Sequence, residues 1–244
     1  MLNEELKAKI IEHAKNVYPS ECCGLIVENA GVFKYYACRN NADNDHQFIL
    51  DPKDYLMASC MGNIKAVVHS HPNASPKPSQ ADMVACEKTK LPWYIVGYPN
   101  QAWYTLEPTG YRAPLVGREW THGVLDCYSI IRDWYIQERG IELPDFERQD
   151  EWWKKGEDLY RQNFGLAGFY KMESERLQVG DVILMQVKSN VPNHGAIYLG
   201  NDQILHHLFN RLSTREVYGG YYKKHTTDIL RFGGIDEKDN TVTR

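Results

Sequence analysis

The sequence lacks any run of apolar residues as long as a membrane-spanning helix requires. Such a helix needs roughly 18 or more consecutive apolar residues, and no stretch of the 244 residues approaches that length. The opening MLNEELKAKI is an amphipathic start and does not have the apolar core of a secretory signal. We therefore expect a protein that is made in the cytosol, is not an integral membrane protein and crosses no membrane by a signal of its own.

The sequence also has no excess of positive charge. Its 28 Lys and Arg residues are outnumbered by 32 Asp and Glu residues, which gives a formal net charge of -4 at pH 7. Proteins that bind nucleic acid generally present a basic surface to the phosphate backbone. We therefore expect no nucleic acid partner. The 16 Tyr and 6 Trp residues instead supply large contact surfaces for cores or for partner proteins.

Internal repeats and low-complexity tracts are absent, so the chain is predicted to form ordinary globular domains. The composition, 43% hydrophobic and 25% charged, is typical of that class. Six cysteines are present, but a chain of this size without a secretory signal is expected to keep its thiols reduced. Cys38, Cys60 and Cys86 fit buried small apolar side chains, whereas Cys127 stands at the beginning of a predicted helix.

Changes in periodicity divide the chain into two blocks. The segment EPTGYRAP, residues 107–114, concentrates Pro and Gly and interrupts the periodic pattern. We therefore predict a first domain over residues 1–108, a linker over 109–114, a second domain over 115–234 and a flexible tail over 235–244. Helices and strands are mixed along the chain, so the predicted fold class is α+β with two domains.

The first block alternates helical and strand patterns. Apolar residues recur at helical spacing in residues 2–17, and Pro19 follows closely enough to end that helix. The further elements, in order, are predicted to be strands GLIVEN and VFKYYAC, a helix DPKDYLMASCMGN, a strand KAVVHSHP, a helix after Ser79, and a hairpin of PWYIVGY and AWYTL.

The second block begins with a helix and continues as strands. LDCYSIIRDWYIQERG places Ile130, Ile131 and Trp134 on an inward face, and Gly140 ends the helix. After a polar, Trp-rich segment, three strands are predicted to form an antiparallel meander: DVILMQV, HGAIYLG and QILHHLF.

The stretch VVHSHPNASPKPSQAD, residues 67–82, gathers residue types that bind metals. Histidines two apart on a strand project from the same face, so His69 and His71 can direct a ring nitrogen to one point. Asp82, in the first turn of the next helix, can add an oxygen and leave a fourth position for water, as in a catalytic zinc site. In a second interpretation, Ser79 and Asp82 form a capping box and the histidines are polar residues at a strand end. The spacing alone leaves both interpretations open.

The complete pattern, HxHP followed after six residues by SxxD, resembles the JAMM motif of the JAB/MPN metallopeptidase family. The matching residues are His69, His71, Pro72, Ser79 and Asp82. The family also carries a glutamate after its first helix, and PSECCG supplies it here as Glu21. The resemblance covers residues 1 to about 108.

This resemblance implies a JAB/MPN-like mixed sheet with helices and one zinc ion bound by His69, His71 and Asp82. It also implies that Glu21 is the general base and that Ser79 helps to hold the oxyanion. These roles are chemically consistent, because zinc lowers the pKa of bound water toward about 7, and a nearby carboxylate can then take and return the proton.

Cys127 opens the predicted helix of the second block, where the positive end of the helix lowers a thiol's pKa. A cysteine nucleophile needs a base, and the candidates are His194 in NHGAIYLG and either His206 or His207 in QILHHL. A hairpin loop with an odd number of residues places His206 on the face of His194, whereas a two-residue loop brings His207 to that face. The same residues also fit a buried cysteine and strand histidines without a joint function. The pattern alone leaves the choice open.

The DC at the start of a helix, the strand NHxxIYLG and a histidine 12 residues after the first resemble the NlpC/P60 cysteine peptidases, which cleave peptide stems of bacterial cell walls. This resemblance implies a papain-like fold with Cys127 as nucleophile, His194 as general base and His206 as the third group, which orients the imidazole. Two departures concern the oxyanion arrangement. The family's usual DCSG is DCYS here, and Leu115 stands about where many members place an active-site tyrosine.

The order of the two blocks, with GREWTHGVLDCYS, VPNHGAIYLG and LHH, resembles the tail tip proteins of lambda-like siphophages across nearly the whole chain. This resemblance implies a virion tail tip component that is made in the bacterial host cytoplasm and contacts other phage tail tip proteins. Its expected substrate is peptidoglycan, cut near the γ-D-glutamyl-diaminopimelate bond as the phage enters the host. Two other functions fit the sequence: a structural tail assembly protein whose protease sites are vestigial or serve only maturation, and a cytosolic JAMM isopeptidase.

Overall fold

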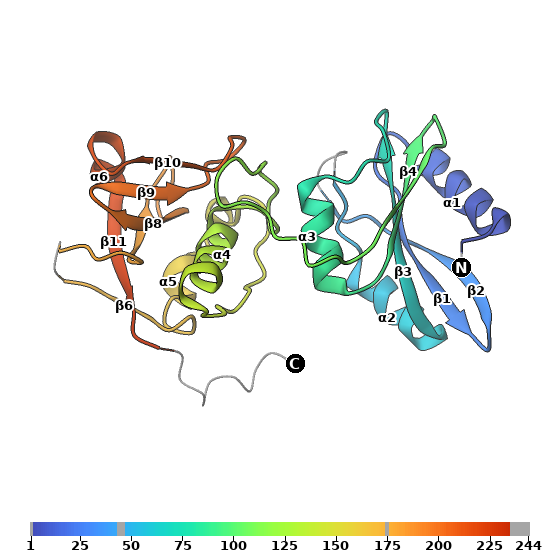
Figure 1. Ribbon diagram of the computed structural model, residues 1–244, viewed down its shortest axis with the longest axis horizontal. Helices are drawn as coiled ribbons and strands as arrows, with labels where there is room; N and C mark the ends of the chain where they lie inside the picture. The colour runs from blue at the N-terminus through green and yellow to red at the C-terminus, as the bar shows by residue number, and fades with distance from the viewer. Residues whose placement is uncertain (1, 43–46, 174–175, 235–244) are drawn as a thin grey trace. The chain divides into compact units, whose positions relative to one another are not determined.

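The computed structural model describes residues 2–42, 47–173 and 176–234. It divides into two compact units, Met1–Arg112 and Ala113–Arg244 (Figure 1). Each unit combines one sheet with helices. The tail predicted over residues 235–244 lies outside the described residues. In the described part of the chain, no helix has both the length and the apolar character that crossing a membrane requires.

The first unit is built on a five-stranded sheet with the order β2-β1-β3-β4-β5. Its strands are β1 Cys23–Asn29, β2 Val32–Cys38, β3 Asn63–Pro72, β4 Trp93–Tyr98 and β5 Trp103–Leu106. Neighbouring strands are antiparallel except for β3 and β4, which run parallel. A parallel pair requires a crossover between its strands. The proline-rich loop and the helix after Ser79 provide that crossover, which carries the chain from the histidines of β3 to β4.

Three helices cover the two faces of this sheet: α1 Glu4–Val17, α2 Pro52–Met61 and α3 Gln80–Thr89 (Figure 1). Successive side chains of β1 point to opposite faces, so alternate residues belong to different cores. Ile26 packs with Leu6 of α1. Leu25 packs in the cluster that contains Ala58 of α2 and Cys86 of α3. The sheet is therefore the middle layer, with α1 on one side and α2 and α3 on the other.

Helix α2 is less buried than its apolar sequence suggests. Ala58 lies in the core, whereas Leu56 is exposed. Cys60 is exposed too, so the prediction that it is buried is wrong, while Cys38 and Cys86 are buried as predicted. The reason is that only one side of this short helix contacts the sheet, and Cys60 points away from it.

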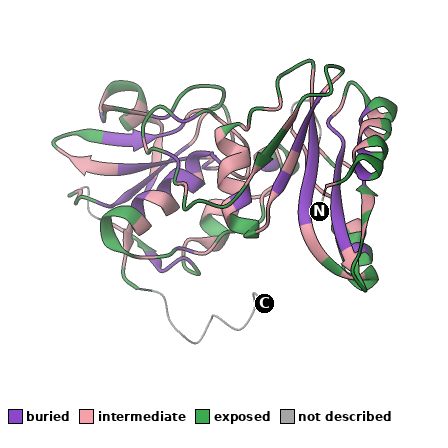
Figure 2. Ribbon diagram, turned by 45° about the vertical axis from the view of Figure 1, so that its right-hand side comes forward, coloured by how far each residue is buried: buried purple, intermediate pink, exposed green. Residues whose placement is uncertain are grey.

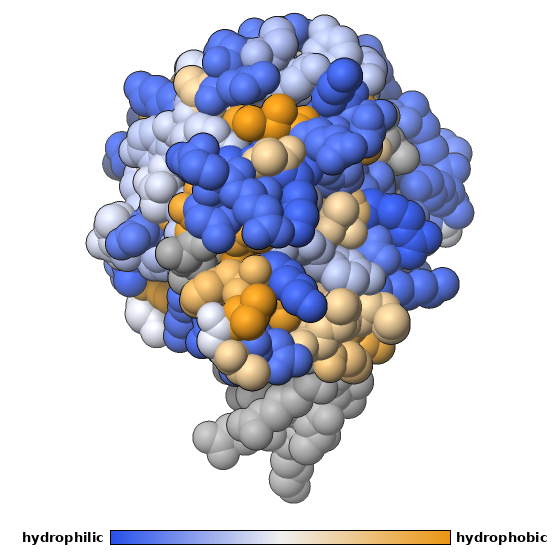
Figure 3. Space-filling view, turned by 90° about the vertical axis from the view of Figure 1, so that its right-hand side faces the viewer, coloured by the Kyte–Doolittle hydropathy of each residue, from blue (hydrophilic) through white to orange (hydrophobic). Residues whose placement is uncertain are grey.

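Burial follows the sheets in both units. Figure 2 shows the buried residues along the strands and on the helix sides that face them. The view in Figure 3 shows a mostly hydrophilic surface on which apolar side chains form small clusters separated by hydrophilic ones.

The second unit contains a six-stranded sheet with the order β10-β9-β8-β7-β11-β6. Its strands are β6 Phe169–Lys171, β7 Val182–Met185, β8 His194–Gly200, β9 Gln203–His206, β10 Thr214–Val217 and β11 Thr226–Phe232. Strands β7, β8 and β9 form the predicted antiparallel meander. Strand β11 was not predicted, because the buried Asp228 interrupts its apolar pattern. Arg161 and Lys171 compensate for that burial with contacts of 2.8 and 2.6 Å to the carboxylate.

Helix α4, Cys127–Arg139, packs against β8, and this packing fixes the position of Cys127 at the start of the helix. Ile130, Ile131 and Trp134 are buried against Ile197 of β8, as the predicted inward face requires. The helix ends at Gly140, whose φ of 66° lies in the left-handed region that favours glycine. The remaining helical segments are η1 Trp152–Lys155, α5 Leu159–Asn163 and α6 Gly220–His225.

Candidate active sites

Strand β3 and the first turn of α3 bring His69, His71 and Asp82 together in the first unit. His69 Nε2 lies 3.0 Å from His71 Nε2 and 3.3 Å from Asp82 Oδ1. His71 Nε2 lies 3.4 Å from Asp82 Oδ2. Ligand atoms of the three residues all lie within 4.8 Å of one another. The two histidines therefore share a strand face, and the crossover returns the aspartate to that same face.

The hydrogen bonding of His71 leaves its Nε2 atom available as a ligand. His71 Nδ1 lies 2.9 Å from the carbonyl oxygen of Ser75. A carbonyl oxygen only accepts, so Nδ1 carries the proton and the lone pair of the neutral ring is on Nε2. His69 is fully buried and stacks on Phe48 with ring centroids 4.8 Å apart. Two imidazole nitrogens and a carboxylate thus converge on one point, an arrangement that a shared proton or a cation stabilises.

This donor set fits zinc. Zinc sites combine imidazole nitrogens at about 2.0 to 2.1 Å with carboxylate oxygens at about 2.0 to 2.2 Å in a tetrahedron, whose ligand atoms are then about 3.4 Å apart. The separations between His69, His71 and Asp82 are 3.0 to 3.4 Å. Three protein ligands leave the fourth position of a tetrahedron open.

Asp82 also belongs to a helix cap, so the two interpretations of SQAD coexist. Ser79 Oγ donates to Asp82 Oδ2 at 2.8 Å, the Ser79 amide donates to the same oxygen at 2.8 Å, and the Asp82 amide donates to Ser79 Oγ at 3.1 Å. Burial opposes ionisation of Asp82, but its contacts with the His69 and His71 rings, together with the cap, hold its pKa well below the usual range. Asp82 is therefore a carboxylate at neutral pH.

Glu21 is buried beside this group. The backbone of its neighbour Cys22 exchanges hydrogen bonds with Ser70 of β3, at 2.8 Å to the hydroxyl and 3.0 Å from the Ser70 amide. Burial raises the pKa of Glu21 to about 8, the charge of His71 opposes that rise, and the charge of Asp82 adds to it. A carboxyl with such a pKa can both give and take a proton near neutral pH.

In the second unit, Cys127 is the first residue of α4 and lines a cavity of about 650 Å³. Asp126 caps this helix, because its side chain accepts hydrogen bonds from the amides of Tyr128 and Ser129. His194 lines the same cavity. Its walls are strongly aromatic and include Trp120, Trp152, Trp153, Tyr160, Phe209 and Tyr221.

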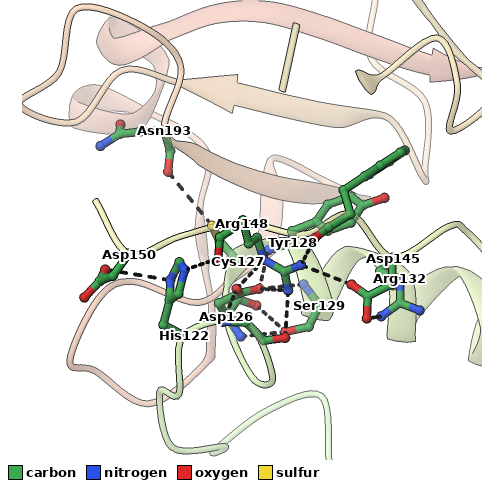
Figure 4. A network of polar contacts seen from close by, with 12 residues as sticks. His122, Asp126, Cys127, Tyr128, Ser129, Arg132, Asp145, Arg148, Asp150 and Asn193 are labelled. Carbon is green, nitrogen blue, oxygen red and sulfur yellow. Dashed lines mark hydrogen bonds and ion pairs between the residues drawn. The ribbon is translucent and has the colours of Figure 1, made fainter. Parts of the chain in front are cut away.

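The Cys127 sulfur contacts a hydroxyl and a carbonyl. Sγ lies 3.2 Å from the Tyr160 hydroxyl. It also lies 4.0 Å from the Asn193 carbonyl oxygen (Figure 4). Burial raises the pKa of Cys127 to about 11 and the charge of Asp126 adds to the rise, while Tyr160 and the Gly195 backbone oppose it. The helix end was expected to lower this pKa. Burial and the adjacent carboxylate outweigh it, so the resting group is a neutral thiol.

His194 and His206 form a hydrogen-bonded pair, with His194 Nε2 3.0 Å from His206 Nδ1. Burial, with a contribution from the neighbouring His206 and His207, lowers the pKa of His194 to about 3. Among the described residues, no hydrogen bond joins Cys127 to His194. The resting site therefore holds a neutral imidazole next to the cavity that a neutral thiol lines.

A β-bulge places His206, and not His207, against His194. The β8–β9 turn has Gly200 opposite Gln203, the two-residue loop that was expected to favour His207. The register shifts between Tyr198 and Gly200, after which His206 lies opposite Ala196. His207 instead lies 2.9 Å from the Arg211 carbonyl through its Nε2 atom. One extra residue in a strand thus reverses which side chains share a face.

Arg148 supports the beginning of α4 from behind (Figure 4). Its Nε and Nη2 atoms donate to both oxygens of Asp126, at 2.6 and 3.1 Å, and Nη1 donates to Asp145 Oδ1 at 3.0 Å. These bonds connect the segment that leads to Trp152 with the N-terminus of the helix that carries Cys127.

Comparison with known proteins agrees with the two-unit organisation. A family model for the NlpC/P60 family matches residues 117–231, and one for prokaryotic homologs of the JAB domain matches residues 3–107. Tail tip assembly protein K of Escherichia phage N15 is 37% identical over 229 residues, which cover 93% of this chain and 93% of that protein. The chain belongs to the tail tip assembly protein K family.

Within this family, protein K of Escherichia phage lambda is 40% identical over 182 residues, 75% of this chain and 88% of that protein. A solved JAB1/MPN domain protein from Archaeoglobus fulgidus is 23% identical, covers 45% of this chain and 90% of its own, and has a TM-score of 0.31. The predicted α+β class and the order of a JAB/MPN-like domain before an NlpC/P60 domain are confirmed.

Two residues of the second site, Tyr160 and Arg148, were not predicted from the sequence. Tyr160, on the short helix α5, contacts the thiol, whereas Leu115 packs against the core cluster. Arg148 lies in the polar segment before η1. The missing tyrosine at Leu115 signalled that a hydroxyl had to come from elsewhere, but 16 tyrosines offered too many candidates. Arg148 carried no signal in the sequence.

Proposed function

We propose that this chain is a component of the phage tail tip whose second unit is a cysteine endopeptidase acting on peptidoglycan stem peptides as the phage enters its host. The expected bond is the one near γ-D-glutamate and diaminopimelate. The observation that supports this most strongly is that Cys127 and the paired His194 line one cavity. Its volume of about 650 Å³ is suited to a short peptide.

The proposed reaction begins with transfer of the Cys127 proton to His194 Nδ1. The thiolate attacks the peptide carbonyl carbon, and the C=O electrons move onto oxygen. The Tyr160 hydroxyl and the amides at the start of α4 are the donors for that oxyanion. His194 then gives its proton to the leaving amine as the C–N bond breaks. Water, deprotonated by His194, hydrolyses the thioester, and the thiol re-forms.

The high pKa of Cys127 in the free protein is compatible with this reaction. In the proposal, the neutral thiol transfers its proton to the neutral His194 imidazole only after substrate fills the cavity. Substrate displaces water, which strengthens the electrostatic effect of the helix end and of Tyr160 on the thiolate. The cavity rim also carries Lys188 and Arg211, for which the described residues supply no ion-pair partner. Their charges are suited to the free carboxylates of a stem peptide.

We propose a second peptidase site in the first unit, with one zinc ion held by His69, His71 and Asp82. When bound, zinc supplies Lewis-acid polarisation and an acidic water. Glu21 takes a proton from the attacking water and returns it to the leaving group. Ser79 has its hydroxyl on Asp82, and it becomes an oxyanion donor after rotation of that hydroxyl. A protein or a wall peptide, cut during assembly or infection, is the proposed substrate class.

Digestion of purified sacculi tests the cysteine peptidase. The wild-type protein should release muropeptides, and Cys127→Ala should release none. Cys60→Ala is the matched control, because it removes an exposed cysteine of the other unit and should leave release unchanged. His71→Ala removes a residue of the site in the first unit, so it distinguishes the contributions of the two units. It should also leave muropeptide release unchanged. Equal muropeptide release by wild type and Cys127→Ala would contradict the proposal.

Elemental analysis of the purified protein tests the zinc site. We expect about one zinc ion per chain, lost in the His69→Ala, His71→Ala double variant. His13→Ala, which removes a histidine of α1 in the same unit, is the control and should retain the metal. Zinc that persists in the double variant would refute the ligand set.

A structural tail component with vestigial sites is the second candidate. It is favoured by the buried thiol of Cys127 and by the missing hydrogen bond between that thiol and His194 in the described structure. Reaction of the native protein with a thiol reagent, followed at the Cys127 peptide, separates the two candidates. Labelling that is lost in Cys127→Ala supports the enzyme, and an inert thiol supports the structural role.

A further inference from the structure

We propose that Glu216 is a positioning residue of the cysteine site, which, together with Tyr222, extends the array of Cys127, His194 and His206 by a carboxylate. This inference rests on the proposed cysteine peptidase and deepens it. It assigns a role to side chains of β10 and α6 that the nucleophile, the base and the third group do not include.

The starting point is a buried ring nitrogen of His206. The side chain of His206 is fully buried, and its Nδ1 atom is taken by His194 Nε2 at 3.0 Å. Its Nε2 atom is buried and has no hydrogen-bond partner in the described part of the chain. A buried polar atom without a hydrogen-bond partner lowers the stability of the folded state. The groups that face this nitrogen are therefore candidates for a functional role.

Glu216 is the carboxylate that faces this nitrogen. Strand β10 pairs with β9 so that Thr214 lies opposite His206, and Glu216, two residues further, points to the same face. Its Oε1 atom lies 3.8 Å from His206 Nε2. That distance is longer than a hydrogen bond, and a small movement of a side chain on this edge strand closes it.

Tyr222 holds Glu216 in this place. Its hydroxyl donates to Glu216 Oε2, which leaves Oε1 for His206. The Tyr222 ring also packs edge-on against the His206 ring, with centroids 4.9 Å apart and an interplanar angle of 83°. One tyrosine of α6 thus orients the carboxylate and covers the imidazole.

The chemistry of the pair requires such a carboxylate. His194 accepts the thiol proton only if Nδ1 has the lone pair, so Nε2 must carry hydrogen and donate to His206 Nδ1. His206 must then carry its own hydrogen on Nε2, the atom that faces Glu216. If His206 instead held its hydrogen on Nδ1, it would donate to His194, whose proton would move to Nδ1 and block the base. An acceptor at His206 Nε2 therefore selects the productive tautomer of both rings.

The carboxylate also favours the charged intermediate. When the thiol proton reaches His194, the positive charge of that imidazolium is shared through His206, and a negative group beyond it is stabilising. Burial lowers the pKa of His206 and the charge of Arg211 adds to that decrease, while Glu216 opposes it by favouring a proton on the ring. The titratable and charged groups that face His206 are His194 on β8, the adjacent His207, Arg211 in the next loop, Glu216 on β10 and Tyr222 on α6.

Alkylation of Cys127 tests this role without a wall substrate. The full-length protein is treated with iodoacetamide between about pH 5 and pH 10, and modification is measured by mass spectrometry on the Cys127 peptide, which separates it from the exposed Cys60. Glu216→Gln keeps the size and removes the charge. We expect the alkylation rate at neutral pH to fall about tenfold and the midpoint of its pH profile to rise by about one unit.

Three further variants make the test specific. Glu138→Gln removes the same charge from the exposed end of α4 and should leave the profile unchanged. Tyr222→Phe should move the profile in the same direction as Glu216→Gln, because the carboxylate is no longer held. Glu216→Asp keeps the charge on a shorter side chain and should lie between wild type and Glu216→Gln. Long-range proton-nitrogen spectra of the imidazoles should show hydrogen on His206 Nε2 in wild type and its loss in Glu216→Gln.

The outcomes separate this inference from the proposed function. An unchanged alkylation profile and an unchanged His206 tautomer in Glu216→Gln would overturn the role of Glu216, even if sacculi are digested. A shifted profile supports that role even if no muropeptide is released, because the readout is the thiol and not the wall.

Discussion

Arg148 donates two hydrogen bonds to the carboxylate of Asp126, the residue that precedes Cys127 (Figure 4). Nε lies 2.6 Å from Oδ2, and Nη2 lies 3.1 Å from Oδ1. Both side chains are almost fully buried. The pair neutralises the charge of the residue that caps α4, and that charge would otherwise raise the pKa of Cys127 further. Arg148 therefore serves both the helix end and the nucleophile on it.

Replacing Arg148 should destabilise the second unit and suppress thiolate formation. Arg148→Gln leaves the Asp126 carboxylate buried without its partner, which typically costs about 3 kcal/mol of unfolding free energy. The pKa of Cys127 should rise at the same time. Lys154→Gln, which removes an exposed ion pair with Glu151, is the control and should cost less than about 1 kcal/mol. Urea unfolding measures the unfolding free energy of both variants. Equal losses of unfolding free energy in Arg148→Gln and Lys154→Gln would contradict the role of the buried pair.

Removing the Tyr160 hydroxyl should reduce activity far more than stability. Tyr160→Phe keeps the ring among its aromatic neighbours and deletes the hydroxyl that lies 3.2 Å from Cys127 Sγ. Loss of one donor to a developing oxyanion typically lowers the rate about a hundredfold. Muropeptide release is the measurement, and thermal unfolding should change little. The matched control is Tyr170→Phe, which deletes an exposed hydroxyl on β6. A Tyr160→Phe protein with full activity would exclude this hydroxyl from the reaction.

Stability of the second unit should decrease as the pH falls below about 6.5. His207 has a pKa lowered to about 4 by burial, and His194 one lowered to about 3, against about 6.5 in the unfolded chain. Between these values the unfolded chain binds protons that the folded chain refuses, so the unfolding free energy drops with falling pH by about 1.4 kcal/mol per pH unit for each histidine. His207→Gln should reduce this slope by about one proton, as measured by urea unfolding at several pH values. A variant with the wild-type slope would show that His207 is not held neutral.

The two roles of the SQAD segment should separate by mutation. Ser79→Ala removes the side-chain cap of α3, which should cost about 1 kcal/mol of unfolding free energy while zinc binding persists. Asp82→Asn keeps a side chain of the same size but removes the anionic ligand, so zinc should no longer raise the unfolding temperature as it does in wild type. Thermal unfolding with and without added zinc distinguishes the two. Equal zinc stabilisation in wild type and Asp82→Asn would remove Asp82 from the ligand set.

The features that depend on local periodicity can be predicted from the sequence alone. Strand alternation places His69 and His71 on one face, and the cap at Ser79 starts the helix that carries Asp82. The position of Cys127 at the first turn of α4 likewise follows from Asp126 as N-cap and from the apolar spacing behind it. These relationships extend over a few residues, so backbone geometry alone is sufficient to predict them.

The features that depend on contacts between distant segments became visible only in the folded chain. The bulge near Tyr198 places His206 on the face of His194, although the two-residue loop predicted His207 there. Tyr160 reaches the thiol across 33 positions of sequence, and Arg148 reaches Asp126 across 22. Burial then reversed the expected pKa shift of Cys127, because desolvation is a property of the packed interior and has no counterpart in the local sequence.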